Sequence, residues 1–151
     1  MSQPDEPSDS RLTRNLNELL QELRVAQAGV QILFAFLLSV AFTERFERAS
    51  AFVHTVHLIT VLLTTASAAL LIAPAAWHRV LFRQRRRAKI IRVGNACALS
   101  GLALLAAAMS STVLLIFQVV LETPWSAAAG ALAGALFAIL WFLLPLRARS
   151  R

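Results

Sequence analysis

The stretch HRVLFRQRRRAKIIR, residues 78–92, decides the fold because it separates two long apolar runs. It carries seven of the fifteen Lys and Arg residues of the chain and no acid. A short loop rich in Lys and Arg between hydrophobic segments stays on the cytoplasmic side of a membrane. The side taken by this loop therefore fixes the side of every other connecting segment.

The composition of the chain is that of a membrane protein. Hydrophobic residues make up 58% of the 151 residues and charged residues 15%, whereas soluble proteins carry about 25% charged residues. A soluble domain of this size buries only about two-thirds of its chain surface, so it would leave much of this apolar surface in water. Cys97 is the only cysteine, which excludes an intrachain disulfide and a cysteine-based zinc site.

Four apolar runs of membrane-spanning length divide the chain. An amphipathic stretch with leucines on one helical face comes before the first run and continues into it without Pro or Gly. We therefore predict an all-α membrane protein, with four transmembrane helices in an antiparallel bundle preceded by an amphipathic N-terminal helix. The predicted divisions are a disordered cytoplasmic tail (1–10), the interfacial helix (11–24), a membrane domain (25–146) with spans at about 25–42, 52–73, 93–121 and 125–146, and a basic cytoplasmic tail (147–151).

The distribution of charge predicts the topology. The segments before the first span, between the second and third spans, and after the fourth span are all basic, while the two other connections are neutral or acidic. Four spans place all three basic segments on one side, as the positive-inside rule requires. We therefore expect a multi-pass protein of the cytoplasmic (inner) membrane with both termini in the cytoplasm.

The fourth span contains small residues at intervals of four. Small residues let the backbones of two membrane helices approach closely. The stripe predicts packing inside the bundle, and a contact between two copies in a homo-oligomer is the alternative. Its members are Ser126, Gly130, Gly134 and Ala138.

Two histidines, His54 and His57, lie one turn apart near the start of the second span. With a carboxylate from Glu44, Glu47 or Glu122 they could bind a metal ion or titrate as a proton site. The alternative is a pair of interfacial histidines bonded to water or backbone. We therefore assign no metal and no cofactor to the chain.

Polar residues also gather at the cytoplasmic ends of the first two spans. On the first helix they follow one stripe, which has to face other helices because an unpaired amide in lipid is costly. The stripe is either the wall of a small polar cavity or a set of interhelical hydrogen bonds. We predict an ion pair of Glu22 or Glu18 with Arg79, acting as a clamp or as a proton-sensitive gate. The candidate cluster is Glu18, Glu22, Arg24, Gln27, Gln31, His78 and Arg79.

The basic loop is expected to contact anionic lipid headgroups rather than nucleic acid, because it is tethered between two spans. No span has a charged residue at its middle, which argues against an ion-coupled transporter with midplane carboxylates. No catalytic motif is present, so we expect no enzyme activity. The residues assigned to headgroup contact are Arg83, Arg85, Arg86, Arg87, Lys89 and Arg92.

Two segments, LNELLQELRVAQAGVQILFAFLLSVAF (16–42) and LIAPAAWHRVLFR (71–83), resemble an uncharacterised actinobacterial family of small four-span membrane proteins. That family is classed as a domain of unknown function, and some members are labelled putative sodium:proton antiporters. We expect an integral membrane protein with a structural or partner-binding role in the bilayer. One candidate partner is a second copy of the chain in a homo-oligomer. The alternative is a small transporter or channel-like subunit.

Overall fold

The computed structural model describes residues 8–81, 87–120 and 125–149; within these ranges, the side chains of 8–13, 15–17, 19, 78–81, 87–92 and 149 lie outside the description. Nearly every described residue is helical, and the described part contains no strand. The elements are α1 (Ser8–Ala41), α2 (Glu44–Glu47), α3 (Ala51–Leu81), α4 (Arg87–Val120), α5 (Ser126–Ala138), a π-helical turn η1 (Ile139–Leu143) and α6 (Leu144–Arg149).

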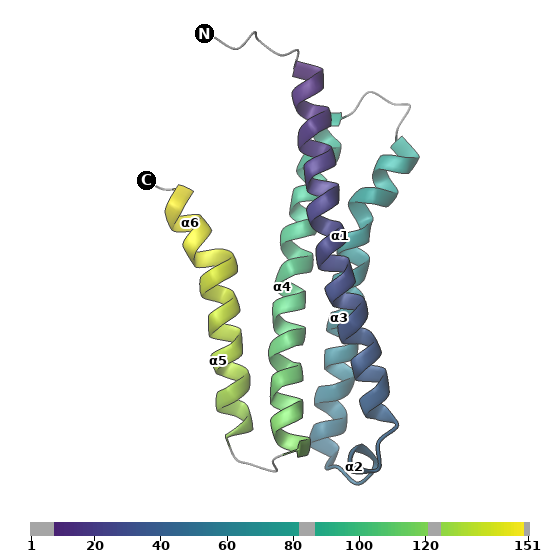
Figure 1. Ribbon diagram of the computed structural model, residues 1–151, viewed down its shortest axis with the longest axis vertical. Helices are drawn as coiled ribbons and strands as arrows, with labels where there is room; N and C mark the ends of the chain where they lie inside the picture. The colour runs from purple at the N-terminus through teal and green to yellow at the C-terminus, as the bar shows by residue number, and fades with distance from the viewer. Residues whose placement is uncertain (1–7, 82–86, 121–124, 150–151) are drawn as a thin grey trace.

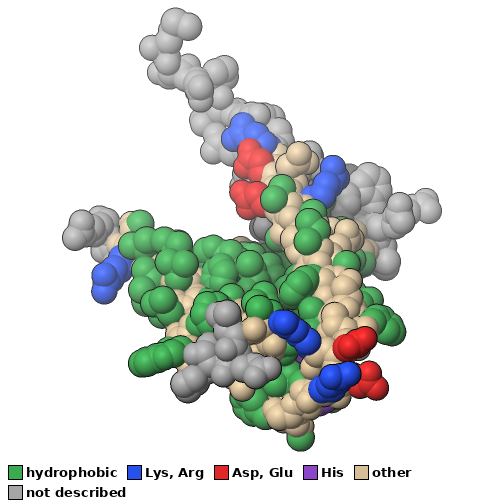
Figure 2. Space-filling view, turned by 60° about the horizontal axis from the view of Figure 1, so that its bottom comes forward, with side chains coloured by type: hydrophobic (Ala, Val, Ile, Leu, Met, Phe, Trp, Pro, Cys, Tyr) green, Lys and Arg blue, Asp and Glu red, His purple; other side chains and the backbone are tan. Residues whose placement is uncertain are grey.

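Four stretches of these helices are long and apolar enough to cross a membrane, and spans that follow one another in the chain run antiparallel (Figure 1). Figure 2 shows apolar side chains over the flanks of the molecule, while charged side chains gather at its two ends. The predicted all-α fold with four spans is confirmed, and it indicates a membrane protein. The stretches are Leu20–Ala41, Ala51–Trp77, Val93–Val120 and Ser126–Ala148.

The two ends of the bundle differ in what they carry. The start of α1, the end of α3, the start of α4 and the end of α6 lie together at one end, which we call the terminal end (Figure 1). The short α2 helix lies at the opposite end, which we call the α2 end. The helix ends that border the three basic segments of the sequence are therefore on the same side of the molecule.

The α3–α4 interface is the tightest part of the bundle. Buried positions on both helices recur at alternating intervals of four and three residues, the spacing that lets antiparallel helices interdigitate along their whole length. Small residues of α4 face larger ones of α3: a Cβ atom on Gly101 would come within 2.9 Å of the Leu71 side chain. The two rows are Val53, His57, Thr60, Thr64, Ser67, Leu71 and Pro74 on α3, and Gly94, Ala98, Gly101, Leu105, Ala108, Thr112 and Leu115 on α4.

Helix α1 completes the core, whereas α5 stays at the edge. Leu23, Val30 and Leu37 of α1, each seven residues apart, are buried against α3 and α4. Among the long helices, α5 makes substantial contact only with α4. As a result, only two residues of the last span, Ser126 and Gly130, are buried, against seven in each of the spans of α3 and α4.

Two prolines lie inside helices rather than at their ends. Helix α3 continues through Pro74 to Leu81, although proline removes one backbone donor from the helix. Next to it, the Nε2 of Gln27 on α1 donates to the carbonyl oxygen of Leu71 at 3.0 Å. In the last span the π-helical turn η1 comes just before Pro145, and its wider turn makes room for the proline ring.

Candidate functional site

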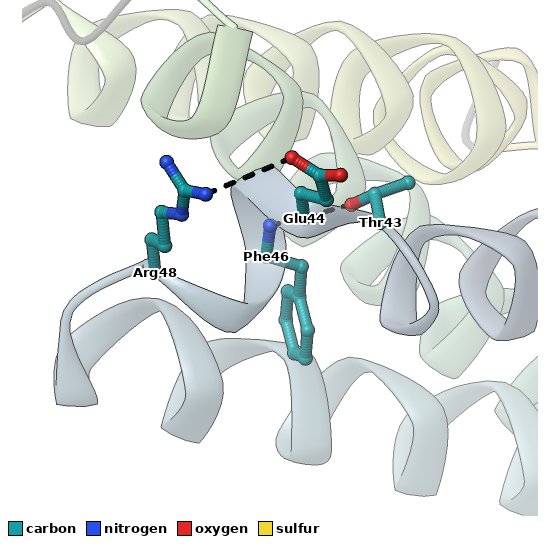
Figure 3. Close-up of polar contacts among 4 residues, drawn as sticks. All are labelled: Thr43, Glu44, Phe46 and Arg48. Carbon is teal, nitrogen blue, oxygen red and sulfur yellow. Dashed lines mark hydrogen bonds and ion pairs between the residues drawn. The ribbon is translucent and has the colours of Figure 1, made fainter.

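The short helix α2 organises the α2 end of the molecule. Thr43 takes an extended backbone conformation, and its hydroxyl accepts a hydrogen bond from the Phe46 amide at 3.3 Å, so it caps α2. The same hydroxyl donates to the carbonyl of Val40 at 2.8 Å, which ties the turn to the end of α1. Figure 3 shows the result: Phe46 points towards α3, and Glu44 and Arg48 lie on the opposite side of α2.

Phe46 packs against both histidines of α3. Its ring centroid lies 4.6 Å from that of His54 and 4.6 Å from that of His57. The Nδ1 of His54 pairs with the Ser50 carbonyl at 3.0 Å, while the Nδ1 of His57, which is 8% exposed, has no hydrogen-bond partner among the described atoms. The Phe46 ring therefore lies directly against both imidazole rings.

A metal site at the histidine pair finds no support in this geometry. In the described ranges, no group of three His, Cys, Asp or Glu residues converges as metal ligands do. Glu44 and Glu47 are exposed on α2, and Glu122 lies outside the described residues. The alternative of two histidines held by packing and backbone is the one that these contacts favour.

Two hollows open at the α2 end, and they share part of their lining. One, of about 550 Å³, which we call the polar hollow, has a mixed lining: Arg45, Arg48, Ser50 and Gln118 are polar or charged, and Ala49, Val53 and Val119 are apolar. The other, of about 320 Å³, lies between α1 and α4 and is almost entirely apolar. Both volumes fall in the range of small-ligand pockets. The sequence alone gave little reason to single out these arginines, because the connector that carries them is electrically neutral.

The predicted polar cluster at the terminal end is brought together only in part. Gln27 reaches α3 through its bond to Leu71, whereas Glu22, Arg24 and Gln31 are exposed. Glu18 forms a 3.9 Å ion pair with Arg14 on its own helix, and both side chains are mostly exposed. The pairing of Glu22 or Glu18 with Arg79 stays a prediction, since the side chains of His78 and Arg79 are outside the description.

Apart from His57, the buried polar side chains described inside the bundle bond to the backbone or to another side chain. The buried hydroxyls of Thr60, Thr64 and Thr112 each donate to a carbonyl one turn earlier in their own helix, at 2.7–2.8 Å. Ser67 instead donates across the interface to the Gly101 carbonyl at 2.7 Å. Among the described residues no Asp, Glu, Lys or Arg is buried. The interior therefore offers packing contacts rather than a set of free ligands.

The small-residue stripe of the last span faces α4 over most of its length. Ser126 and Gly130 are buried, and the Ser126 hydroxyl donates to the Oε1 of Gln118. A Cβ on Gly130 would lie 2.9 Å from Leu114 Cβ, and one on Gly134 would lie 3.4 Å from Ser110 Oγ. Ala138 is exposed. The stripe thus packs within the chain, up to its last member.

A model of the DUF6328 family, described as a family of unknown function, matches residues 5–145. The chain belongs to this family. No curated protein and no solved structure matches the chain.

The family match covers the first three spans, the fourth span as far as Pro145, and both hollows at the α2 end. It stops before the last arginines of the basic tail, including Arg147. The resemblance seen in the two sequence segments is confirmed. Because the DUF6328 description carries no activity, the function of the chain has to be argued from its geometry.

The basic loop contributes nothing further to the described geometry. Arg83, Arg85 and Arg86 lie outside the described residues, and the side chains of Arg87, Lys89 and Arg92 are outside the description as well. Their contact with anionic headgroups stays a prediction.

Proposed function

We propose that this protein is a non-enzymatic, partner-binding membrane protein whose partner in the bilayer is a second copy of itself. The observation that supports the proposal is the exposure of Gln31. This residue lies in the middle of the span Leu20–Ala41, about 16 Å from either end at 1.5 Å per residue. An amide at that depth faces hydrocarbon, which cannot hydrogen-bond with it.

A second copy is the partner that the chemistry of this surface favours. A glutamine amide both donates and accepts, so two Gln31 side chains related by a twofold axis complement each other. Small residues flank it on the same exposed face of α1: Ala28 and Ala35, three residues before and four residues after Gln31, are both exposed. Small residues beside a polar one are typical of interfaces between membrane helices.

The proposal is preferred over a transporter because of the interior. The buried hydroxyls of Thr60 and Thr64 are bonded to carbonyls of their own helix, and a coupled transporter uses ionisable groups inside the membrane instead. The residues of the described core therefore support a helix assembly.

The test is disulfide cross-linking in native membranes. With Cys97→Ser as background, Ala28→Cys, which lies one turn before Gln31 on the same exposed face and keeps its amide, is expected to give a covalent dimer on mild oxidation. Matched controls are Leu62→Cys on α3 and Leu136→Cys on α5, both exposed apolar positions near mid-span, and they should stay monomeric. Equal dimer yields at all three positions would mean random collision and would refute the Gln31 contact.

The proposal includes an orientation, with the terminal end in the cytoplasm and the α2 end on the opposite side of the cytoplasmic membrane. It is supported by the three basic segments that border the terminal end. Reporter fusions after Arg92 and at the C-terminus should report cytoplasm, and a fusion at Ser50 should report the opposite side. A non-cytoplasmic signal from the fusion after Arg92 would contradict the orientation.

A further inference from the structure

The two hollows at the α2 end adjoin each other. Arg45 and Val119 line both of them, so the polar hollow and the apolar groove form neighbouring compartments of one site. One compartment carries guanidinium groups and the other carries hydrocarbon. A ligand that fills both has to be an amphiphile with an anionic head.

The polar hollow contains two arginines, and acidic side chains neutralise their guanidinium groups only weakly. Arg48 lies 3.8 Å from Glu44, but both side chains are more than four-fifths exposed, so this ion pair contributes little. Arg45 has no acidic side chain within ion-pair distance among the described residues. Gln118 and Ser50 add hydrogen-bonding groups to the lining. Guanidinium groups match phosphate oxygens in geometry and can bind them through two bonds each.

The apolar groove has walls that are already in place. Leu37 and Leu115, which line it, are 1% and 4% exposed and belong to one core cluster with Val53, which lines the polar hollow. From Thr43 at its mouth to Phe36 the groove follows α1 for about 10 Å. That is roughly the outer third of a hydrocarbon core of about 30 Å. The groove has the depth and chemistry for the first part of an acyl chain.

We propose that these two compartments bind one anionic phospholipid, with its phosphate-bearing head at Arg45 and Arg48 and an acyl chain in the groove between α1 and α4. The α2 connector has two acids and two bases, so it sets up no net field that would attract anionic lipids in general. Selectivity at this end must therefore come from the local arrangement of the two arginines. The basic loop differs from this site, because its net positive charge alone is enough to attract anionic headgroups.

This site is separate from the contact proposed between two copies. Phe36 follows Gln31 by five residues, which places them about 140° apart around α1. A variant at Gln31 therefore leaves the groove untouched, and failure of one proposal leaves the other standing.

The experiment is native mass spectrometry of the purified full-length protein, titrated with phosphatidylglycerol or phosphatidylcholine. We expect one retained phosphatidylglycerol per chain and about tenfold weaker retention of phosphatidylcholine. Arg45→Gln should weaken phosphatidylglycerol binding about tenfold, and Val40→Phe, which fills the groove, should weaken the binding of both lipids. Arg24→Gln, an equal loss of charge at an exposed position of the terminal end, is the matched control and should bind like the parent.

Three results would overturn the proposal. Equal losses for Arg45→Gln and Arg24→Gln would reduce the binding to overall charge. Equal retention of the two lipids would remove head-group recognition. Displacement of the lipid by inorganic phosphate at equal concentration would show an anion site that makes no use of the groove. Thermal stability of the lipid-free variants, expected to match the parent for both arginine variants, separates a lost site from a lost fold.

Discussion

The two sides of α4 differ in how closely they pack against the neighbouring helices α3 and α5. Towards α3, the buried row of α4 is mostly small, with Gly94, Ala98, Gly101 and Ala108 among its seven residues. Three of the seven residues in the facing α3 row carry hydroxyls. Towards α5, close approach is concentrated near Gly130, and beyond it α5 carries exposed leucines such as Leu132 and Leu136. Lipid provides no hydrophobic drive for helices to associate, so contact depends on close packing. Helices α3 and α4 therefore form the fixed core of the bundle, and α5 is a helix attached to its edge.

The largest effect is expected from overfilling the α3–α4 interface. In Gly101→Leu the new side chain would start 2.9 Å from the Leu71 side chain, which is fully buried and has no room to move. Overpacking of a core costs about 1–3 kcal/mol and occasionally more, so we expect a loss at or above the top of that range. The measurement is the unfolding midpoint in mixed detergent. Ala103→Leu, on the exposed face of the same helix, is the control and should unfold like the parent.

An intermediate effect is expected at the α4–α5 interface. In Gly130→Ala the added Cβ would lie 2.9 Å from Leu114 Cβ and 3.2 Å from the Ser110 carbonyl oxygen, so α5 has to move away. In Gly134→Ala the nearest atom is Ser110 Oγ at 3.4 Å, a contact that a side chain tolerates. Both changes gain about 1 kcal/mol of helix propensity. The difference between them therefore isolates the clash.

The readout for this pair is the labelling rate of a cysteine at the buried Ser126 position, in a Cys97→Ser background. Gly130→Ala should raise the rate severalfold by loosening α5, and Gly134→Ala should leave it unchanged. The α3–α4 core should keep its unfolding midpoint in both variants. A joint loss of both interfaces would contradict the distinction between fixed core and attached helix.

The sequence predicted the spans because length and apolar composition are properties of single segments. It did not reveal α2, since a four-residue helix depends on the cap by Thr43 and on the packing of Phe46 against α3. The four-three spacing of His57, Thr60, Thr64 and Ser67 is visible in the sequence, but the surrounding residues are apolar on all faces and conceal it. The stripe on α1 was expected to face other helices, and Gln27 does so. Gln31 does not, because the direction of each residue depends on where α3 and α4 lie around α1.

The smallest effect is expected from the hydroxyls that line the α3–α4 interface. Ser67 bonds across it to the Gly101 carbonyl, so Ser67→Ala removes a link between the helices; such bonds in membrane proteins contribute about 0.6 kcal/mol on average. Thr64 donates to its own helix at Thr60, so Thr64→Val keeps the shape and loses only a local bond. We expect Ser67→Ala to lower the unfolding free energy by about 0.5–1 kcal/mol and Thr64→Val to change it less. If Thr64→Val costs as much as Ser67→Ala, the interface depends on hydroxyl chemistry along the whole row, and the close packing at Gly101 is not its main source of stability.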